Sequence, residues 1–268
     1  MDFVTNIVDI HTHAFADELA PKAMPSMIER AAGRVTAYYD GTVSGLVAEM
    51  DRTGVAVSVI QPVATKESQV RTINDWAAAQ ASPRIVPFGA MHPDVADPAA
   101  EIARMKSIGL RGFKLHPEHQ SFAPNEPRMH AIYQAAVDHG MIVLFHAGND
   151  LMHPTLHGTP ESFAEVLDEF CDLTAILAHL GGWREWKGVA EHLAGRDVWL
   201  DTAYTLGHLP DEEFVALVRS HGTDRVLFGS DGPWTDVAAE VEHLRSLHFT
   251  SAELDAVLGE NASRLLGL

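Results

Sequence analysis

Residues Ile7–His13 read IVDIHTH, and this stretch decides how the chain folds. It is a short apolar run that ends in two histidines one residue apart, which predicts a buried strand. Because side chains on a strand alternate between its faces, Asp9, His11 and His13 are expected on one face, with neighbours roughly 6.5–7 Å apart. Two imidazoles at that spacing can converge on one metal ion; a chance pair at a strand end is the alternative.

The same pattern recurs along the chain, where apolar runs alternate with amphipathic segments. Strands are expected over 7–13, 55–60, 85–90, 110–116, 141–146, 174–179, 198–202 and 225–231. Helices are expected over 44–52, 68–81, 98–108, 126–139, 159–170, 183–194, 210–221, 237–247 and 251–266. Near-continuous apolar strands separated by helices indicate a parallel sheet that is buried on both faces.

Eight such units in 268 residues fit an α/β fold of the (β/α)8 TIM-barrel type, with its active site at the C-terminal mouth. An open doubly wound sheet is the runner-up, but no Gly-x-Gly-x-x-Gly follows the first strand. No linker or internal repeat interrupts the pattern, so one domain over 1–268 is predicted. The long connection over 14–45 is expected to be irregular and to cover the active site.

The net charge of the chain indicates which classes of binding partner it is unsuited to. Acidic residues outnumber basic ones by 37 to 19, and a net charge of −18 argues against nucleic acid or an anionic membrane surface. The first residues lack the features of a signal peptide, and no apolar run reaches the ~18 residues of a membrane span. A cytoplasmic protein is therefore expected. Its one cysteine, Cys171, excludes an internal disulfide and is predicted to be buried.

Polar residues gather at the predicted strand ends, and histidine recurs among them. Parallel barrel strands all end at one mouth, where barrel enzymes keep their catalytic groups. We therefore expect these side chains to meet: His11, His13, Gln61, His92, Lys114, His116, His146, His179, Asp201, Thr202 and Asp231. Each of these residues also has an alternative interpretation. His146 and His179 could be core histidines that bond to the backbone, and Asp231 could cap a turn.

Four of these ends resemble the amidohydrolase-related branch of the metal-dependent amidohydrolase superfamily. The motifs are His11-Thr12-His13, Phe145-His146-Ala147-Gly148, Ala178-His179-Leu180-Gly181-Gly182 and Gly229-Ser230-Asp231-Gly232-Pro233, and Phe113-Lys114-Leu115-His116-Pro117 is typical of a subset. The resemblance covers the whole chain in the expected order. It implies a metal shell of His11, His13, His146 and Asp231, with Asp231 also the general base. His179 would bind a second metal or stabilise a developing oxyanion.

Whether the site holds one or two ions is left open by the resemblance. Lys114 and His116 share a strand face: as a carbamate Lys114 would bridge two ions, and as a free cation it would hold Asp231 or a substrate carboxylate. His116 would be either a metal ligand or a substrate contact. Histidine and aspartate ligands suit a divalent transition metal, for which Zn²⁺ is expected and Fe²⁺ and Mn²⁺ are alternatives.

These features predict a metal-dependent hydrolase, in which a metal-activated water attacks an amide, ester, lactone or thioester of a small organic molecule. The alternative is a lyase that decarboxylates or hydrates an aromatic or unsaturated acid, and a third interpretation is a metal-holding scaffold without catalysis. Few cations are expected near the mouth to bind a carboxylate, which favours hydrolysis.

The predicted substrate contacts combine two groups of residues. Lys114 and His116 are expected at the strand end, and Tyr38, Trp183 and Trp234 are expected in the loops above it. Packing between helix and barrel is the alternative for the two tryptophans. Assembly into a homo-oligomer is neither indicated nor excluded by the sequence.

Overall fold

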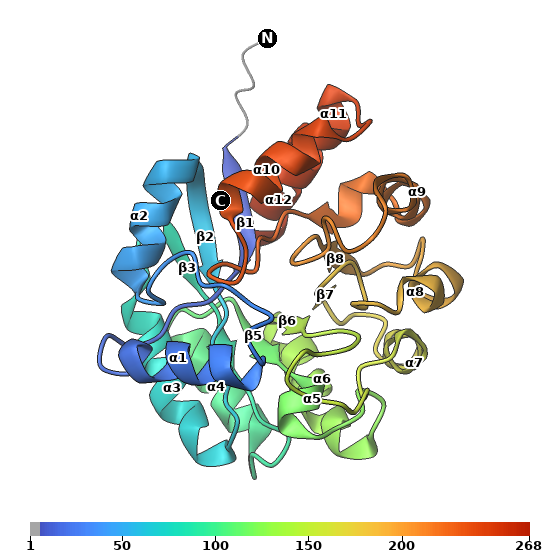
Figure 1. Ribbon diagram of the computed structural model, residues 1–268. Helices are drawn as coiled ribbons and strands as arrows, with labels where there is room; N and C mark the ends of the chain where they lie inside the picture. The colour runs from blue at the N-terminus through green and yellow to red at the C-terminus, as the bar shows by residue number, and fades with distance from the viewer. Residues whose placement is uncertain (1–5) are drawn as a thin grey trace.

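Short parallel strands form a ring in the computed structural model of this protein, which describes residues 6–268 (Figure 1). The strands are β1 (Ile7–Thr12), β2 (Val55–Ile60), β3 (Ile85–Pro87), β4 (Gly89–Ala90), β5 (Gly112–Leu115), β6 (Ile142–Phe145), β7 (Ala175–Leu177), β8 (Trp199–Asp201) and β9 (Val226–Leu227). The strand predicted over 85–90 is interrupted at Phe88 and accounts for both β3 and β4. The eight predicted strands are therefore all found.

The strands pair in sequence order, as a barrel requires. The orders are β1-β2-β3 and β4-β5-β6-β7-β8-β9, and every pair is parallel. The last strand meets the first, because the Ile10 amide donates to the Phe228 carbonyl at 2.9 Å and the Asp231 amide donates to the His11 carbonyl at 2.9 Å. The predicted TIM barrel is thus confirmed.

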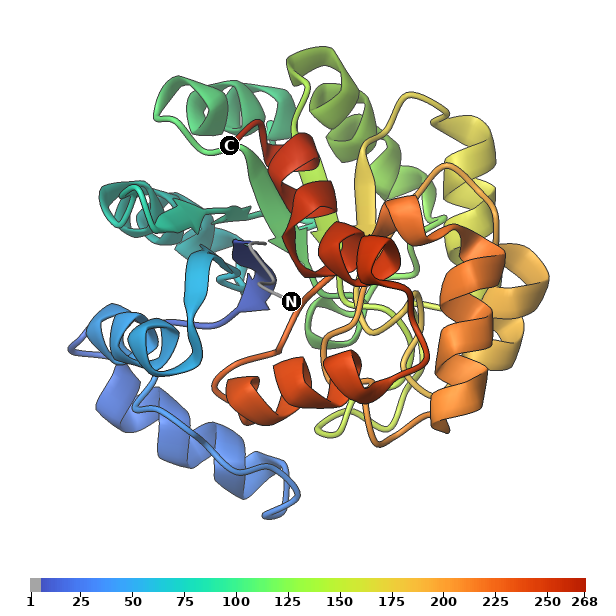
Figure 2. The same cartoon turned by 90° about the horizontal axis from the view of Figure 1, so that it is seen from above.

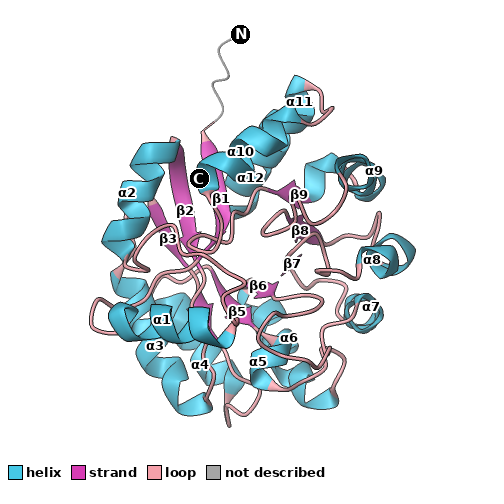
Figure 3. Ribbon diagram, viewed as in Figure 1, coloured by secondary structure: helices cyan, strands magenta, loops and turns pink. Residues whose placement is uncertain are grey.

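Helices surround the ring (Figure 3). The α-helices are α1 (Ala20–Arg30), α2 (Val43–Thr53), α3 (Val70–Ala79), α4 (Pro98–Ser107), α5 (Pro117–Gln120), α6 (His130–His139), α7 (Pro160–Glu169), α8 (Trp186–His192), α9 (Asp211–His221), α10 (Val237–Ser246), α11 (Ser251–Asp255) and α12 (Asn261–Leu266). Short 3₁₀ turns cover Glu67–Gln69, Pro127–Met129 and Thr223–Arg225, and a π-helical segment covers Ala256–Glu260.

Two of these helices lie where none was expected. The connection over 14–45 is not irregular throughout, because it contains α1, whose first turn accommodates Pro21. The second is α5, a single turn that follows β5 directly and begins with Pro117.

The barrel interior below the mouth is filled by apolar side chains. Val8, Ile10, Leu144 and Ile176 share one buried cluster with Leu266 of α12. Figure 2 shows the C-terminal helices, in red, lying over the ring of strands. One end of the barrel is therefore covered by α12.

β1 departs from the regular alternation that its sequence predicts. Its register with β2 shifts between Asp9 and Thr12. Instead of joining the two histidines, the Asp9 carboxylate accepts hydrogen bonds from the backbone amides of His11 (3.1 Å) and Ser230 (3.0 Å). Asp9 thus anchors the end of β1 to the segment after β9, and the expectation that it shares a face with His11 and His13 is wrong.

Two further observations concern the surface. Cys171 is exposed and not buried as predicted, because it lies in the turn that follows α7, where its thiol contacts the Asp168 carbonyl. None of the helices described between residues 6 and 268 has the length and apolar character that a membrane-crossing segment needs.

Candidate active site

A cavity of about 770 Å³ opens at the carboxyl ends of the strands. Side chains from six different strand ends line it: His11 and His13, Gln61, Lys114 and His116, His146, His179, and Asp231. His92, Asp201 and Thr202, which were expected to join them, do not line the cavity. Two of these residues have left-handed backbone, His179 at φ 59° and Asp231 at φ 69°. Such conformations are uncommon outside glycine and tend to occur at functional sites.

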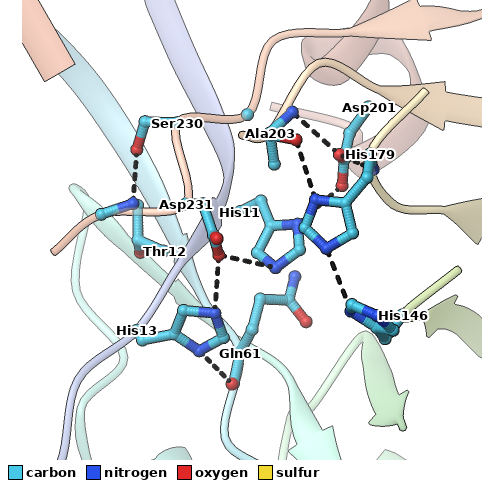
Figure 4. A network of polar contacts seen from close by, with 12 residues as sticks. His11, Thr12, His13, Gln61, His146, His179, Asp201, Ala203, Ser230 and Asp231 are labelled. Atoms are coloured by element: carbon cyan, nitrogen blue, oxygen red, sulfur yellow. Dashed lines mark hydrogen bonds and ion pairs between the residues drawn. The ribbon is translucent and has the colours of Figure 1, made fainter. Parts of the chain in front are cut away.

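His11, His13 and Asp231 form the tightest group at the floor of this cavity (Figure 4). Asp231 Oδ1 lies 3.0 Å from His13 Nε2 and 3.5 Å from His11 Nε2. The three donor atoms all lie within 4.8 Å of one another, a separation that one metal ion could bridge. The structure therefore brings these three residues together, as the sequence predicts.

Both histidines are held with Nε2 facing Asp231. His11 Nδ1 lies 2.8 Å from Asp201 Oδ2, and His13 Nδ1 lies 3.0 Å from the Gln61 carbonyl oxygen. Since a carbonyl or a carboxylate oxygen accepts, each Nδ1 carries the proton and each Nε2 keeps its lone pair. This is the tautomer that a metal ligand needs, with outer partners of the kind that orient metal-bound histidines.

Asp231 is suited to act as an anion. Burial by itself raises the pKa of its carboxyl, but the 3.0 Å contact with His13 Nε2 and the neighbouring histidines outweigh burial and hold that pKa below its usual value. A carboxylate with two imidazole nitrogens is a common donor set for a divalent transition metal. The residues present therefore fit a divalent metal ion.

His146 and His179 form a neighbouring pair that is not part of the three-residue group. His179 Nδ1 lies 2.8 Å from the Ala203 carbonyl oxygen, so Nδ1 carries the proton and Nε2 keeps a lone pair. That Nε2 lies 3.0 Å from His146 Nδ1. The ring of His179 also lies 5.3 Å from that of His11, measured between centroids. His179 Nε2 is therefore in a position to bind a metal or to accept a hydrogen bond.

Lys114 and His116, which come from the same strand end, have separate surroundings. Lys114 Nζ lies 3.2 Å from His11 Nε2, and burial lowers the pKa of this lysine to about 8. The ring of His116 instead stacks on that of His146 at 4.1 Å and is close to His119 and Asp150. Lys114 thus belongs to the His11 group, and His116 belongs to a second group.

The predicted substrate contacts are found only in part. Trp183 and Trp234 line the cavity. Tyr38 does not: 47% of this residue is exposed, and it lies outside the set of residues that line the cavity. Its neighbour Tyr39 does not line the cavity either, but its hydroxyl donates a hydrogen bond to the His13 carbonyl at 2.7 Å. Neighbouring tyrosines face different surroundings, and the sequence does not distinguish them.

Sequence reasoning missed several residues of the site. Arg30 lines the cavity from α1, a helix that was not predicted. His119 and Asp150 lie against His116. His119 could have been found from the run His116-Pro117-Glu118-His119, since histidines three residues apart face the same way on a helical turn. Asp201 was noted at a strand end, but its contact with His11 was not foreseen.

The comparisons with known proteins agree with this geometry. A family described as amidohydrolase matches residues 8–268. None of the curated proteins matches the chain. Three solved structures are among the similar folds, each with less than 25% sequence identity.

The first is 5-carboxyvanillate decarboxylase from Sphingomonas paucimobilis, with a TM-score of 0.73 and 18% identity over 98% of this chain and 99% of the other. The second is the decarboxylase of that name from Novosphingobium aromaticivorans, complexed with manganese and 4-hydroxy-3-methoxy-5-nitrobenzoic acid, with a TM-score of 0.74 and 14% identity over 100% and 97%. The third, from Pseudomonas putida, is provisionally assigned as a 2-pyrone-4,6-dicarboxylic acid hydrolase and has a TM-score of 0.69 and 18% identity over 98% of each chain.

Proposed function

This chain belongs to the amidohydrolase family, and from that premise we propose that it is a metal-dependent hydrolase of a small organic molecule with an apolar or aromatic body. The observation that carries the proposal is the position of Asp231. Its Oδ1 lies within 3.5 Å of the Nε2 atoms of both His11 and His13, on the floor of the cavity. A carboxylate in this position can take a proton from a water molecule.

His11, His13 and Asp231 would hold the divalent metal, and His146 and His179 stand beside them. When bound, the metal supplies a Lewis acid that polarises a carbonyl and lowers the pKa of a water molecule. Asp231 takes the proton, and Asp201 keeps His11 oriented. His179 Nε2 accepts a hydrogen bond from the substrate side or becomes a further ligand. Zn²⁺ remains the expected metal, with Fe²⁺ and Mn²⁺ as alternatives.

The walls of the cavity suggest the class of substrate. Apolar side chains dominate, among them Phe15 and Met27 from the 14–45 connection and Trp76, Trp183 and Trp234 from elsewhere. A volume of about 770 Å³ is in the range of pockets for small organic molecules. The proposed substrate therefore has an aromatic or unsaturated body with a carbonyl group that reaches the strand ends.

Decarboxylation is the second candidate, and Arg30 favours it. The argument for hydrolysis from a shortage of cations at the mouth is weakened, because Arg30 on α1 and Lys114 on β5 both line the cavity. Two cations can bind a substrate carboxylate. Two of the similar folds named above are decarboxylases of an aromatic acid, which supports the same reading.

One experiment separates the two reactions. The metal-loaded protein is incubated in H₂¹⁸O with a panel of aromatic lactones and esters and, separately, with hydroxylated benzoates. Hydrolysis predicts ¹⁸O in the product acid and no carbon dioxide, whereas decarboxylation predicts carbon dioxide and no labelled acid. Asp231→Asn serves as the control and should abolish either product. Turnover that Asp231→Asn leaves unchanged would contradict both candidates.

A further inference from the structure

A second group of potential metal ligands lines the same cavity and is not used by the proposed reaction. Asp150 Oδ2 lies 3.7 Å from His116 Nε2 and 3.9 Å from His119 Nε2. The three residues have ligand atoms that all lie within 4.8 Å of one another. We propose that His116, His119 and Asp150 form a second site for a divalent transition metal such as Zn²⁺, separate from the site at His11, His13 and Asp231.

The separations are close to those of a tetrahedral ion. With Zn–N and Zn–O bonds of about 2.0–2.1 Å, tetrahedral ligand atoms stand about 3.3–3.5 Å apart. The two separations from Asp150 Oδ2 exceed that value by a few tenths of an ångström. Three protein ligands also leave a fourth position open, which is typical of sites that bind a substrate or water.

Backbone amides hold Asp150 in place and leave one of its oxygens free. Oδ1 accepts hydrogen bonds from the amides of Met152 at 2.6 Å and His153 at 3.0 Å. Oδ2, which faces the two histidines, takes no part in those bonds. The carboxylate is therefore oriented before any ion binds, and little side-chain entropy remains to be lost on binding.

The two histidines are fixed by the short helix that joins them. His116 follows β5 as the N-cap of α5, and His119 lies one turn later in α5, with their ring centroids 4.1 Å apart. Gln120 locks this turn: its Oε1 accepts from the His116 amide at 2.9 Å, and its Nε2 donates to the Ala64 and Met91 carbonyls at 2.7 Å each. The spacing of the donors is set by a rigid element.

Glu118 places a buried carboxylate oxygen beside His116. Its Oε1 accepts from the amides of His157 and Gly158 at 3.0 Å each, whereas its Oε2 is buried and has no hydrogen-bond partner among the described residues. That Oε2 lies 3.7 Å from His116 Nδ1 and 3.8 Å from His146 Nε2, and His116 Nδ1 accepts a hydrogen bond from the His119 amide at 3.4 Å. Binding of an ion at His116 Nε2 would move the proton of this ring to Nδ1, where the buried Glu118 oxygen would accept it.

The charges around the group suit a dication. Burial lowers the pKa of both His116 and His119, so these imidazoles are neutral. Burial also raises the pKa of Asp150 and raises that of Glu118 to about 7, and a bound cation would stabilise the charged form of both carboxyls. The open position faces the cavity, where Arg30 Nη2 lies 3.4 Å from His153 Nε2. The ligand class for that position is an anionic oxygen, the carboxylate or phenolate of a substrate whose other end reaches His11.

The test is metal stoichiometry, which does not depend on activity. Metal-free protein is titrated with Zn²⁺ and dialysed, and zinc is measured by mass spectrometry, while zinc anomalous scattering from crystals locates the ions. The wild type is expected to hold two equivalents. His11→Ala should hold one, with its anomalous peak at His116, His119 and Asp150. His119→Ala and Asp150→Asn should each hold one, with the peak at His11, His13 and Asp231.

The controls separate ligand loss from unfolding. Asp150→Asn keeps an Oδ1 acceptor for the Met152 and His153 amides, and His248→Ala removes an exposed histidine far along the chain. Both should retain the wild-type circular dichroism, and His248→Ala should still hold two equivalents. A wild type without an anomalous peak at His116, His119 and Asp150, or a second equivalent that survives in both His119→Ala and Asp150→Asn, overturns the proposal. A wild type whose peak lies at His116, His119 and Asp150 but not at His11, His13 and Asp231 would contradict the proposed function and leave this proposal standing.

Discussion

Asp201 Oδ2 lies 2.8 Å from His11 Nδ1, and this contact joins β8 to β1 across the mouth of the barrel. The other carboxylate oxygen of Asp201 accepts from the backbone amides of His179 at 2.9 Å and Ala203 at 3.1 Å. One fully buried side chain therefore orients the ring of His11 and the backbone that carries His179. It does so without lining the cavity.

Asp201→Asn is expected to weaken metal binding without unfolding the protein. The amide can present an N–H toward His11 Nδ1, which disfavours the tautomer with a free Nε2, and loss of such a partner typically lowers metal affinity by about 10- to 100-fold. Zinc affinity by chelator competition is the measurement. Asp168→Asn is the matched control, because the 68% exposed Asp168 side chain pairs only with Arg196 at the surface. Equal affinities for the two variants would contradict the role given to Asp201.

Asp231→Asn should reduce turnover by about 10²–10⁴-fold, the usual contribution of a group that moves a proton in the reaction. His11→Ala should also reduce turnover, because it removes a proposed metal ligand. Each should also reduce the metal content at the His11 site. Steady-state kinetics on the substrate found by the labelling experiment provide the measurement. If both variants keep full turnover, the assignment of the site is wrong.

Removal of metal should stop the reaction reversibly. Dialysis against a chelator is expected to abolish turnover, and addition of Zn²⁺, Mn²⁺ or Fe²⁺ to restore it, because the histidine and aspartate ligands bind divalent ions that exchange. Thermal unfolding followed in parallel shows whether the chain stays folded. Activity that persists in the metal-free protein would be incompatible with the proposed mechanism.

Arg30→Ala tests whether Arg30, which lines the cavity from α1, binds a substrate carboxylate. If it does, KM for carboxylate substrates should rise about 10-fold while kcat changes little, since a hydrogen bond to a charged group contributes about 1.5–3 kcal/mol. Lys22→Ala is the control, because Lys22 is an exposed cation on the same helix and does not line the cavity. The same KM for both variants would remove Arg30 as an argument for decarboxylation.

Gly148→Ala should destabilise the protein far more than Gly54→Ala. Both glycines have left-handed backbone, at φ 83° and φ 77°, which costs an alanine about 1–2 kcal/mol. An added Cβ at Gly148 would lie 2.2 Å from the backbone nitrogen of Trp183, whereas at Gly54 it would meet nothing within 4 Å. The overlap adds about 1–3 kcal/mol or more. Urea unfolding of both variants measures the difference, and similar midpoints would refute the clash.

Much of the site could be predicted because the strands of a barrel can be recognised in the sequence. A buried parallel strand is an apolar run, and the first polar residue after each run lies at the mouth whatever its neighbours are. Reading the last residues of each strand therefore identified His11, His13, Lys114, His146 and Asp231 as members of one surface.

Contacts that depend on loop conformation could not be read in this way. α1 begins near two prolines, and its helical pattern is short, so Arg30 was not placed at the mouth. Tyr38 and Tyr39 are adjacent, and which of them turns inward depends on the path of the connection over 14–45. Asp9 left the face of His11 because β1 changes register with β2, an event that involves a second strand.

The sequence by itself determined the barrel, the order of its strands and most of the polar residues at the strand ends of its mouth, because periodicity and burial are local properties of the chain. Only the tertiary structure decided how that set divides. It placed Lys114 against His11 but its strand neighbour His116 against His119 and Asp150. Hydrogen bonds across the barrel, such as that of Asp201 with His11, fix which nitrogen of each ring is free, and residues 190 positions apart make them.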